Sequence, residues 1–153
     1  MYGMEQRLQA LESIEVIKQL KVQYCLHCDD NYNGAAISSL FTEDGAWESD
    51  TFGRYEGRDA IASYFDAISA RISFAAHLLM NPIVTITAPD RAIGKWRLLM
   101  PCTAQEADRP EAYWLTTSYS DRFRRVDGRW YFEDLQARTE IFAPHRFGWA
   151  QTA

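Results

Sequence analysis

The sequence predicts an α+β fold in which helices come first and a mainly antiparallel sheet follows. Within residues 5–28 and 61–71, apolar residues recur every three or four positions, which is typical of helices with one buried face. Beyond residue 73, apolar and polar residues alternate between turn-forming pairs, as in strands. With 153 residues, 47% of them hydrophobic, the chain is expected to form one domain over residues 1–153 with a substantial core.

Three helices are expected in the first half of the chain. Residues 5–28 predict a long helix, whose apolar stripe consists of Leu8, Leu11, Ile14, Ile17, Leu20, Tyr24 and Cys28. The turn formers of residues 29–34 end it. Shorter helices are predicted over residues 35–41 and 61–71.

The strands are predicted from alternation and from the turn residues between them. Residues 73–87 predict one strand, with Phe74, Leu78, Met80, Val84 and Ile86 on one face and Ala75, His77, Leu79 and Asn81 on the other. Other strands are expected at 46–48, 92–100, 112–126 and 130–142, with a turn at 53–58, a loop at 101–110 and a hairpin turn at 127–128.

Composition argues against several classes of partner. The net charge of −5 and a pI near 5.2 do not suit nucleic-acid binding, and the basic run at residues 122–125 is interpreted as the solvated outer face of a strand. No apolar run is long enough to span a bilayer, and the N-terminus does not resemble a secretion signal. We therefore expect a cytoplasmic protein with no membrane and no nucleic-acid partner.

The three cysteines do not predict a disulfide framework. Cys25 and Cys28 form a CxxC motif, but the motif ends a helix, where the dipole disfavours a thiolate. Because Cys102 is the remaining thiol and no second CxxC exists, we expect neither a metal nor a redox cofactor.

His77 and Asp29 are the strongest candidates for chemistry. His77, one of three histidines, lies in an apolar stretch where an imidazole needs a partner, and Asp29 lies at a helix end where a carboxylate has the wrong sign for the dipole. The structural interpretations are a satisfied core histidine and a helix-capping aspartate. The functional interpretation is a proton-transfer pair in which the carboxylate fixes the imidazole tautomer. The sequence leaves both interpretations open.

Several segments resemble the SnoaL-like branch of the nuclear transport factor 2-like superfamily. Within it the chain is similar to the group of scytalone dehydratase, hexachlorocyclohexane dehydrochlorinase and bile acid 7α-dehydratase. The segments are residues 14–18 leading to Tyr24 and Asp29, residues 40–45, residues 55–58, His77, and residues 124–130.

The resemblance implies a cone, in which a curved sheet of mixed but mainly antiparallel strands wraps around the long helix and two shorter ones. It also implies an apolar pocket, cofactor-free lyase chemistry and a catalytic pair formed by His77 and Asp29. Tyr24 and Arg138 fall where the bile acid enzyme has a tyrosine and an arginine. Tyr55, Tyr64, Tyr113 and Tyr119 are candidates for the two tyrosines that the fungal dehydratase uses, and Trp47 is a further candidate for contact with the substrate.

The expected function is that of a lyase, a dehydratase, acting on a small hydrophobic cyclic substrate. His77 would remove a proton, Asp29 would hold its ring, and Tyr24 and Arg138 would stabilise negative charge. Alternatives are an isomerase that shares the proton abstraction and a non-catalytic ligand-binding or structural subunit of the same fold.

The C-terminal segment adds an expectation about assembly. Phe147 and Trp149 follow the last predicted strand in a stretch interrupted by Pro144 and Gly148. Large apolar side chains there need a surface to cover, either the pocket mouth or another subunit. We expect a homotrimer or homodimer with both side chains buried.

Overall fold

The computed structural model describes residues 3–107 and 109–151 and contains three α-helices, a short 3-10 helix and seven strands in that part of the chain. The helices are α1 (Met4–Asp29), α2 (Gly34–Ser38), α3 (Arg58–Ser69) and the 3-10 helix η1 (Trp149–Gln151). The strands are β1 (Phe41–Ser49), β2 (Gly53–Glu56), β3 (Ile72–Ala75), β4 (Leu78–Ala88), β5 (Arg91–Gln105), β6 (Pro110–Val126) and β7 (Arg129–Pro144). The predicted α+β class is confirmed.

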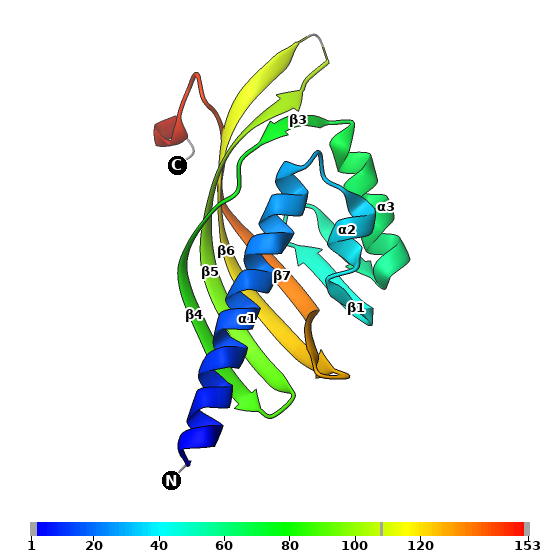
Figure 1. The fold of residues 1–153 in the computed structure, drawn as a ribbon. Coiled ribbons are helices and arrows are strands. Elements are labelled where there is room, and N and C mark those ends of the chain that lie inside the picture. The colour runs from blue at the N-terminus through cyan, green and yellow to red at the C-terminus, as the bar shows by residue number, and fades with distance from the viewer. Residues whose placement is uncertain (1–2, 108, 152–153) are drawn as a thin grey trace.

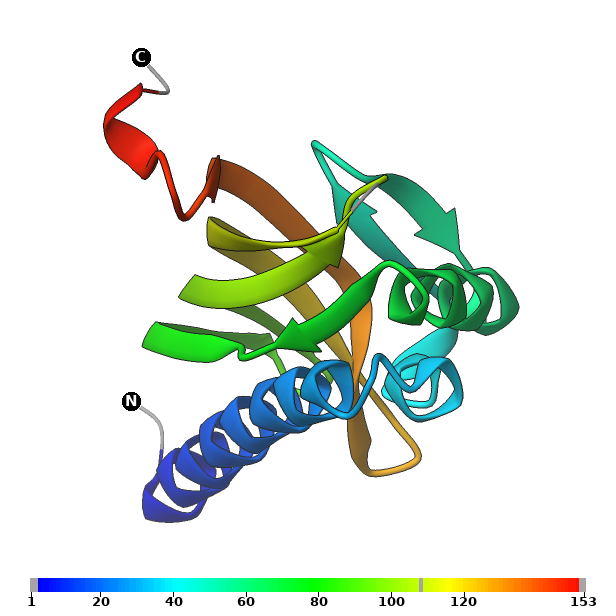
Figure 2. The same ribbon diagram turned by 90° about the horizontal axis from the view of Figure 1, so that it is seen from above.

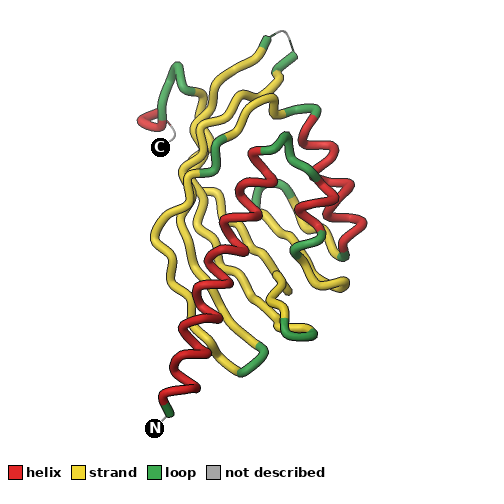
Figure 3. Tube along the Cα trace, viewed as in Figure 1, coloured by secondary structure: helices red, strands yellow, loops and turns green. Residues whose placement is uncertain are grey.

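The strands form one curved sheet in the order β2-β1-β7-β6-β5-β3, and β4 pairs with β5 beside β3. All pairs are antiparallel except β1 with β7. Figure 1 shows α1 running diagonally across the concave side of the sheet, with α2 and α3 beside the end of α1. The view from above in Figure 2 and the tube in Figure 3 show the same arrangement, in which the helices lie on one side of the curved sheet. No helix in the described ranges has the length and apolarity to cross a membrane.

The core lies between α1 and the concave sheet face. From α1 it receives Ile17, Leu20 and Tyr24, and from the sheet mainly aromatic side chains such as Phe123 and Phe132. The first half of the predicted helix stripe is different, because Leu8 and Leu11 are 56% and 63% exposed. Figure 1 shows the start of α1 extending beyond the sheet.

The predicted single strand over residues 73–87 is wrong, because it is interrupted. β3 ends at Ala75 and β4 begins at Leu78, and both pair with β5. The carbonyl of Pro101 on β5 accepts from the N–H of Ala76 at 3.1 Å, but proline has no N–H to give back. The ladder is therefore incomplete at Pro101. Because the N–H of Ala76 points to β5 and the register is the same on both sides of the break, the N–H of the next residue, His77, points away from β5 and is available to another partner.

Two other strand predictions need correction. Val84, Ile86 and Leu79 all pack on the core. The alternation pattern had placed Val84 and Ile86 on one face of the strand and Leu79 on the other. A register shift between Met80 and Ile83 reverses the faces. The predicted loop over residues 101–110 is mostly strand, because β5 continues to Gln105.

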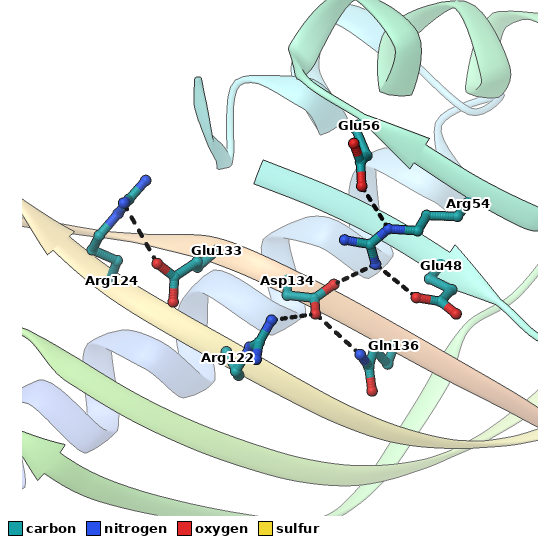
Figure 4. A network of polar contacts seen from close by, with 8 residues as sticks. All are labelled: Glu48, Arg54, Glu56, Arg122, Arg124, Glu133, Asp134 and Gln136. Carbon is teal, nitrogen blue, oxygen red and sulfur yellow. Dashed lines mark hydrogen bonds and ion pairs between the residues drawn. The ribbon is translucent and has the colours of Figure 1, made fainter. Parts of the chain in front are cut away.

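The outer face of the sheet is held by a charged network. Asp134 on β7, whose side chain is 4% exposed, contacts Arg122 of β6 at 2.7 Å and Arg54 of β2 at 3.4 Å, as Figure 4 shows. Arg54 also contacts Glu48 and Glu56 (Figure 4). Arg124, on the basic run of β6, contacts Glu133 and Asp44. The basic run thus lies on the outer side of the sheet, where its partners are acids of neighbouring elements.

Candidate active site

A cavity of about 260 Å³ lies between the helices and the concave face of the sheet. Its walls come from α1, α3 and most strands, and they are mainly aromatic and aliphatic. Ligand pockets are typically about 300–1,000 Å³, so this cavity suits a molecule of one or two fused rings. His77 lies in its wall.

Asp29 and His77 are in direct contact. Oδ1 of Asp29 lies 2.6 Å from Nδ1 of His77, and the backbone N–H of His77 donates to both carboxylate oxygens, at 3.0 and 3.2 Å. The His77 side chain is 5% exposed and that of Asp29 is 30% exposed. In the tautomer that donates from Nδ1 to Asp29, Nε2 carries a lone pair and has no hydrogen-bond partner in the described chain. The pair can therefore accept a proton from a molecule in the cavity.

Asp29 reaches His77 without any loosening of the end of α1. Tyr24 and Asp29 point in different directions on an ideal helix, so both could reach one cavity only if the helix loosened. Instead α1 stays regular through Asp29, and the N–H of Asp30 still donates to the carbonyl of Leu26 at 2.9 Å. Tyr24 lines the cavity, whereas Asp29 lies outside the lining and contacts it through His77.

Tyr24 is a buried phenol with a defined hydrogen bond. Its hydroxyl accepts from Nε1 of Trp47 at 2.9 Å, and an indole N–H can only donate. The phenolic proton is therefore not used by Trp47, and the thiol of Cys28, a weak acceptor, lies within its reach. Burial raises the pKa of Tyr24 well above its ordinary value, with a further rise from Cys28, so the phenol stays protonated at neutral pH.

Tyr32 is a cavity residue that the sequence reasoning missed. It follows α1 in a left-handed backbone conformation, with φ of 52°, and its ring meets the His77 ring edge-on at 5.9 Å. Its hydroxyl contacts only the Met100 sulfur, at 3.9 Å, a weak acceptor. Burial raises the Tyr32 pKa as well. Turn-forming neighbours suggested a surface turn, and nothing in a residue-by-residue pattern marks a tyrosine that turns back inward.

The other predicted aromatic residues divide into two groups. Trp47, Tyr64 and Tyr119 line the cavity. Tyr55 and Tyr113 do not: Tyr55 stacks on Tyr64 with centroids 4.1 Å apart, and Tyr113 stacks on the lining residue Phe142 at 4.8 Å. These two rings therefore support the wall without forming it.

The structure does not bring Arg138 to the cavity. Arg138 is exposed, while its neighbours Ala137 and Thr139 line the cavity. Simple alternation from the buried Trp130 and Phe132 would turn Arg138 inward, but the pairing of β6 with β7 shifts by one residue beyond Phe132. That bulge turns Leu135, Ala137 and Thr139 inward, so the predicted role of Arg138 is not supported by the geometry.

Comparison with known proteins agrees with this architecture. The SnoaL-like domain family matches residues 9–136. The chain belongs to the SnoaL-like domain family. No curated protein sequence matches it significantly.

Solved structures similar to this SnoaL-like protein have the same fold. Hexachlorocyclohexane dehydrochlorinase LinA-type3 from Novosphingobium barchaimii superposes with a TM-score of 0.82 at 21% identity, covering 90% of this chain and 93% of that one. A candidate scytalone dehydratase from Novosphingobium aromaticivorans gives 0.79 at 21%, covering 90% of each chain. An NTF2-like protein with a cystatin-like fold, also from N. aromaticivorans, gives 0.73 at 25%, covering 90% and 92%. The NTF2-like fold is thereby confirmed.

A buried ion pair lies behind the cavity wall of this SnoaL-like protein. Nζ of Lys21 contacts Oδ2 of Asp121 at 2.8 Å, and both side chains are fully buried. The ammonium lies 3.4 Å from the ring centroid of Tyr119, a cation–π contact. Sequence reasoning missed this pair, although both residues lie on predicted apolar faces. Lys21 is one helical turn from Ile17, and Asp121 shares a strand face with Tyr119 and Phe123.

The three cysteines are free and buried. Burial raises the pKa of Cys25 to about 12 and that of Cys102 to about 11, so neither is a ready thiolate. Within the described ranges, no group of three or more His, Cys, Asp and Glu side chains is placed to hold a metal ion.

Proposed function

We propose that this protein is a cofactor-independent lyase, a dehydratase, that acts on a small hydrophobic cyclic substrate. The observation that carries the proposal is the contact of Nδ1 of His77 with Asp29, with the imidazole in the wall of an apolar cavity. The SnoaL-like family and its dehydrochlorinase and dehydratase neighbours support a lyase.

In the proposed reaction His77 acts as the general base. Nε2 takes a proton from a carbon next to a carbonyl group, and the electron pair of the C–H bond moves onto the carbonyl oxygen to form an enolate. Asp29 keeps the ring in the tautomer with Nδ1–H and stabilises the imidazolium, without becoming protonated itself. General-base catalysis of this kind contributes about 10²–10⁴-fold to the rate.

The enolate oxygen needs donors, and the cavity offers phenols in place of an arginine. Tyr24 accepts from Trp47 and has only the weak acceptor Cys28 for its proton, and the hydroxyl of Tyr32 contacts only the Met100 sulfur, so both can donate to a substrate. Tyr119 lines the cavity, and its hydroxyl has no hydrogen-bond partner in the described chain. Burial raises the pKa of all three phenols, so they remain donors.

The second half of the reaction expels the leaving group. The enolate electrons reform the carbonyl and a new C=C bond, and the hydroxyl on the neighbouring carbon departs. The His77 imidazolium returns its proton to this hydroxyl, so water is released and the base is restored.

The proposal is tested with β-hydroxy ketones of one or two rings. Wild-type protein should convert at least one of them to the conjugated enone with release of one water, followed by ultraviolet absorbance and NMR, and His77→Ala should lose this activity. A double bond that shifts without loss of water would indicate the isomerase alternative. A panel that the wild type leaves unchanged, although the compounds bind, would favour a non-catalytic binding protein.

A further inference from the structure

Arg71 is the one residue with a permanent positive charge among the described residues that line the cavity. It lies just after α3 and before β3, and its carbonyl accepts from the N–H of Gln105 on β5 at 2.7 Å. The residue is exposed, so its guanidinium lies where the cavity opens to solvent. Its backbone position is thus fixed, while its side chain can reach a bound molecule.

Arg71 has no acidic partner within 4.0 Å in the described chain, in contrast to Arg54, Arg122 and Arg124 on the outer face. The other permanently charged lining residue is Glu106, and its carboxylate already accepts from the hydroxyl of Tyr113 at 2.7 Å. A guanidinium without a partner beside an apolar cavity is a site for an anion.

The charge of Arg71 also reaches into the cavity. Burial raises the pKa of Tyr64, and the positive charge of Arg71 partly opposes that rise. Tyr64 lines the cavity and contacts Trp47, with centroids 4.8 Å apart. An anionic group of a bound molecule would therefore be attracted to this end of the cavity, while its rings contact the aromatic wall.

We propose that the substrate carries a single carboxylate at the end remote from the reacting carbon, and that Arg71 binds it at the cavity mouth. The position of the reacting carbon rests on the proposed function, because His77 marks it. A guanidinium matches a carboxylate with two parallel hydrogen bonds. A phosphate with two negative charges is disfavoured, because Glu106 shares the mouth and the protein has a net charge of −5.

This assignment specifies the substrate class. The cavity of about 260 Å³ accommodates one or two fused rings, the walls favour an apolar ring system, and the mouth favours one acid group. The substrate is then a small cyclic keto acid with a hydroxyl β to its ketone.

The test measures binding of matched probes to the full-length protein by isothermal titration calorimetry. The probes are 2-naphthoate, 2-naphthamide and 2-naphthyl phosphate, which share one ring system and differ in charge. The wild type should bind the carboxylate about five- to tenfold more tightly than the amide, as expected for a solvent-accessible charge pair with bidentate geometry. Arg71→Gln should abolish this preference, and Arg71→Lys should keep part of it.

Arg91→Gln is the matched control, because it removes the same charge at the start of β5, outside the cavity lining, where Arg91 contacts Asp90. It should keep the full preference. Equal binding of acid and amide by the wild type would overturn the proposal, as would a preference that survives in Arg71→Gln, tighter binding of the phosphate, or no binding of any probe.

A failure of the proposed lyase function would be distinguishable from a failure of this site. The binding preference does not depend on proton transfer, so it is measured without any turnover. A preference that persists in a protein without dehydratase activity would leave the Arg71 site standing and remove only the reaction.

Discussion

Oδ1 of Asp29 accepts two hydrogen bonds from His77, one from the backbone N–H at 3.0 Å and one from Nδ1 at 2.6 Å. A single carboxylate therefore fixes both the chain position and the ring orientation of the histidine. This is possible because the N–H of Ala76 donates to Pro101 on β5, so the N–H of the next residue, His77, points away from β5 and lies outside the sheet ladder.

Removing a single phenolic hydroxyl should slow the reaction without unfolding the protein. Tyr119→Phe and Tyr24→Phe keep the rings that pack in the core and remove one donor to the enolate. Loss of one such donor typically costs about 10²-fold in kcat. The effect is measured on a β-hydroxy ketone that the wild type converts. Tyr55→Phe is the control, because Tyr55 does not line the cavity and its hydroxyl donates to the backbone carbonyl of Phe52, so its turnover should stay close to wild type.

Lys21→Met should destabilise the fold strongly. It leaves the carboxylate of Asp121 buried without its partner, which typically costs about 3–5 kcal/mol of unfolding free energy. Urea denaturation followed by tryptophan fluorescence measures the change. The double variant Lys21→Met/Asp121→Leu removes both charges and should be more stable than Lys21→Met alone. A double variant less stable than the single one would show that the pair does not act as a unit.

Asp121 should give stability a distinct pH dependence. Burial raises its pKa from 3.8 to about 6, so between these values the folded state holds a proton that the unfolded chain releases. The contribution of this carboxyl to stability is full below pH 3.8 and is lost as the pH rises through about 6. Asp121→Asn should lack this component, so the stability difference between wild type and variant should change from pH 4 to pH 7. Parallel pH profiles of the two proteins would contradict this.

The sequence predicted most of the fold because the periodicities of α1, α3 and the hairpin at Asp127-Gly128 are local and unbroken. It failed where one residue changes the register. The bulge after Phe132 turns Arg138 outward, and the shift between Met80 and Ile83 reverses the faces of β4. Neither bulge has a signature in alternation alone.

The candidate site was predictable to the extent that its residues conflict with their surroundings. His77 in an apolar stretch and Asp29 at a helix end were such conflicts, and the structure brings them together. Lys21 within the apolar face of α1 was a third that could have been found in the same way. Tyr32 conflicts with nothing, because its place in the cavity depends on the left-handed turn after α1.

The expected homo-oligomer should depend on the C-terminal segment. Phe147 and Trp149 are 52% and 59% exposed in the single chain. The N–H of His145 donates to the carbonyl of Ala112 on β6, which holds the start of the segment against the sheet. We propose that a neighbouring subunit covers the two exposed rings. Deleting residues 144–153 should reduce the mass measured by light scattering at micromolar concentration. A wild-type protein that is monomeric there would refute the idea.

The most direct test of the central claim is a double-mutant cycle on His77 and Asp29. The rate measured is the exchange of the α-proton of a bound cyclic ketone for deuterium in heavy water, followed by NMR, because it reports proton abstraction without the later loss of water. His77→Ala and Asp29→Asn should each slow exchange by about 10²–10⁴-fold, and the double variant should be scarcely slower than the slower single variant. Losses that add in full, or an Asp29→Asn variant that exchanges as fast as the wild type, would contradict a base formed by the two residues together.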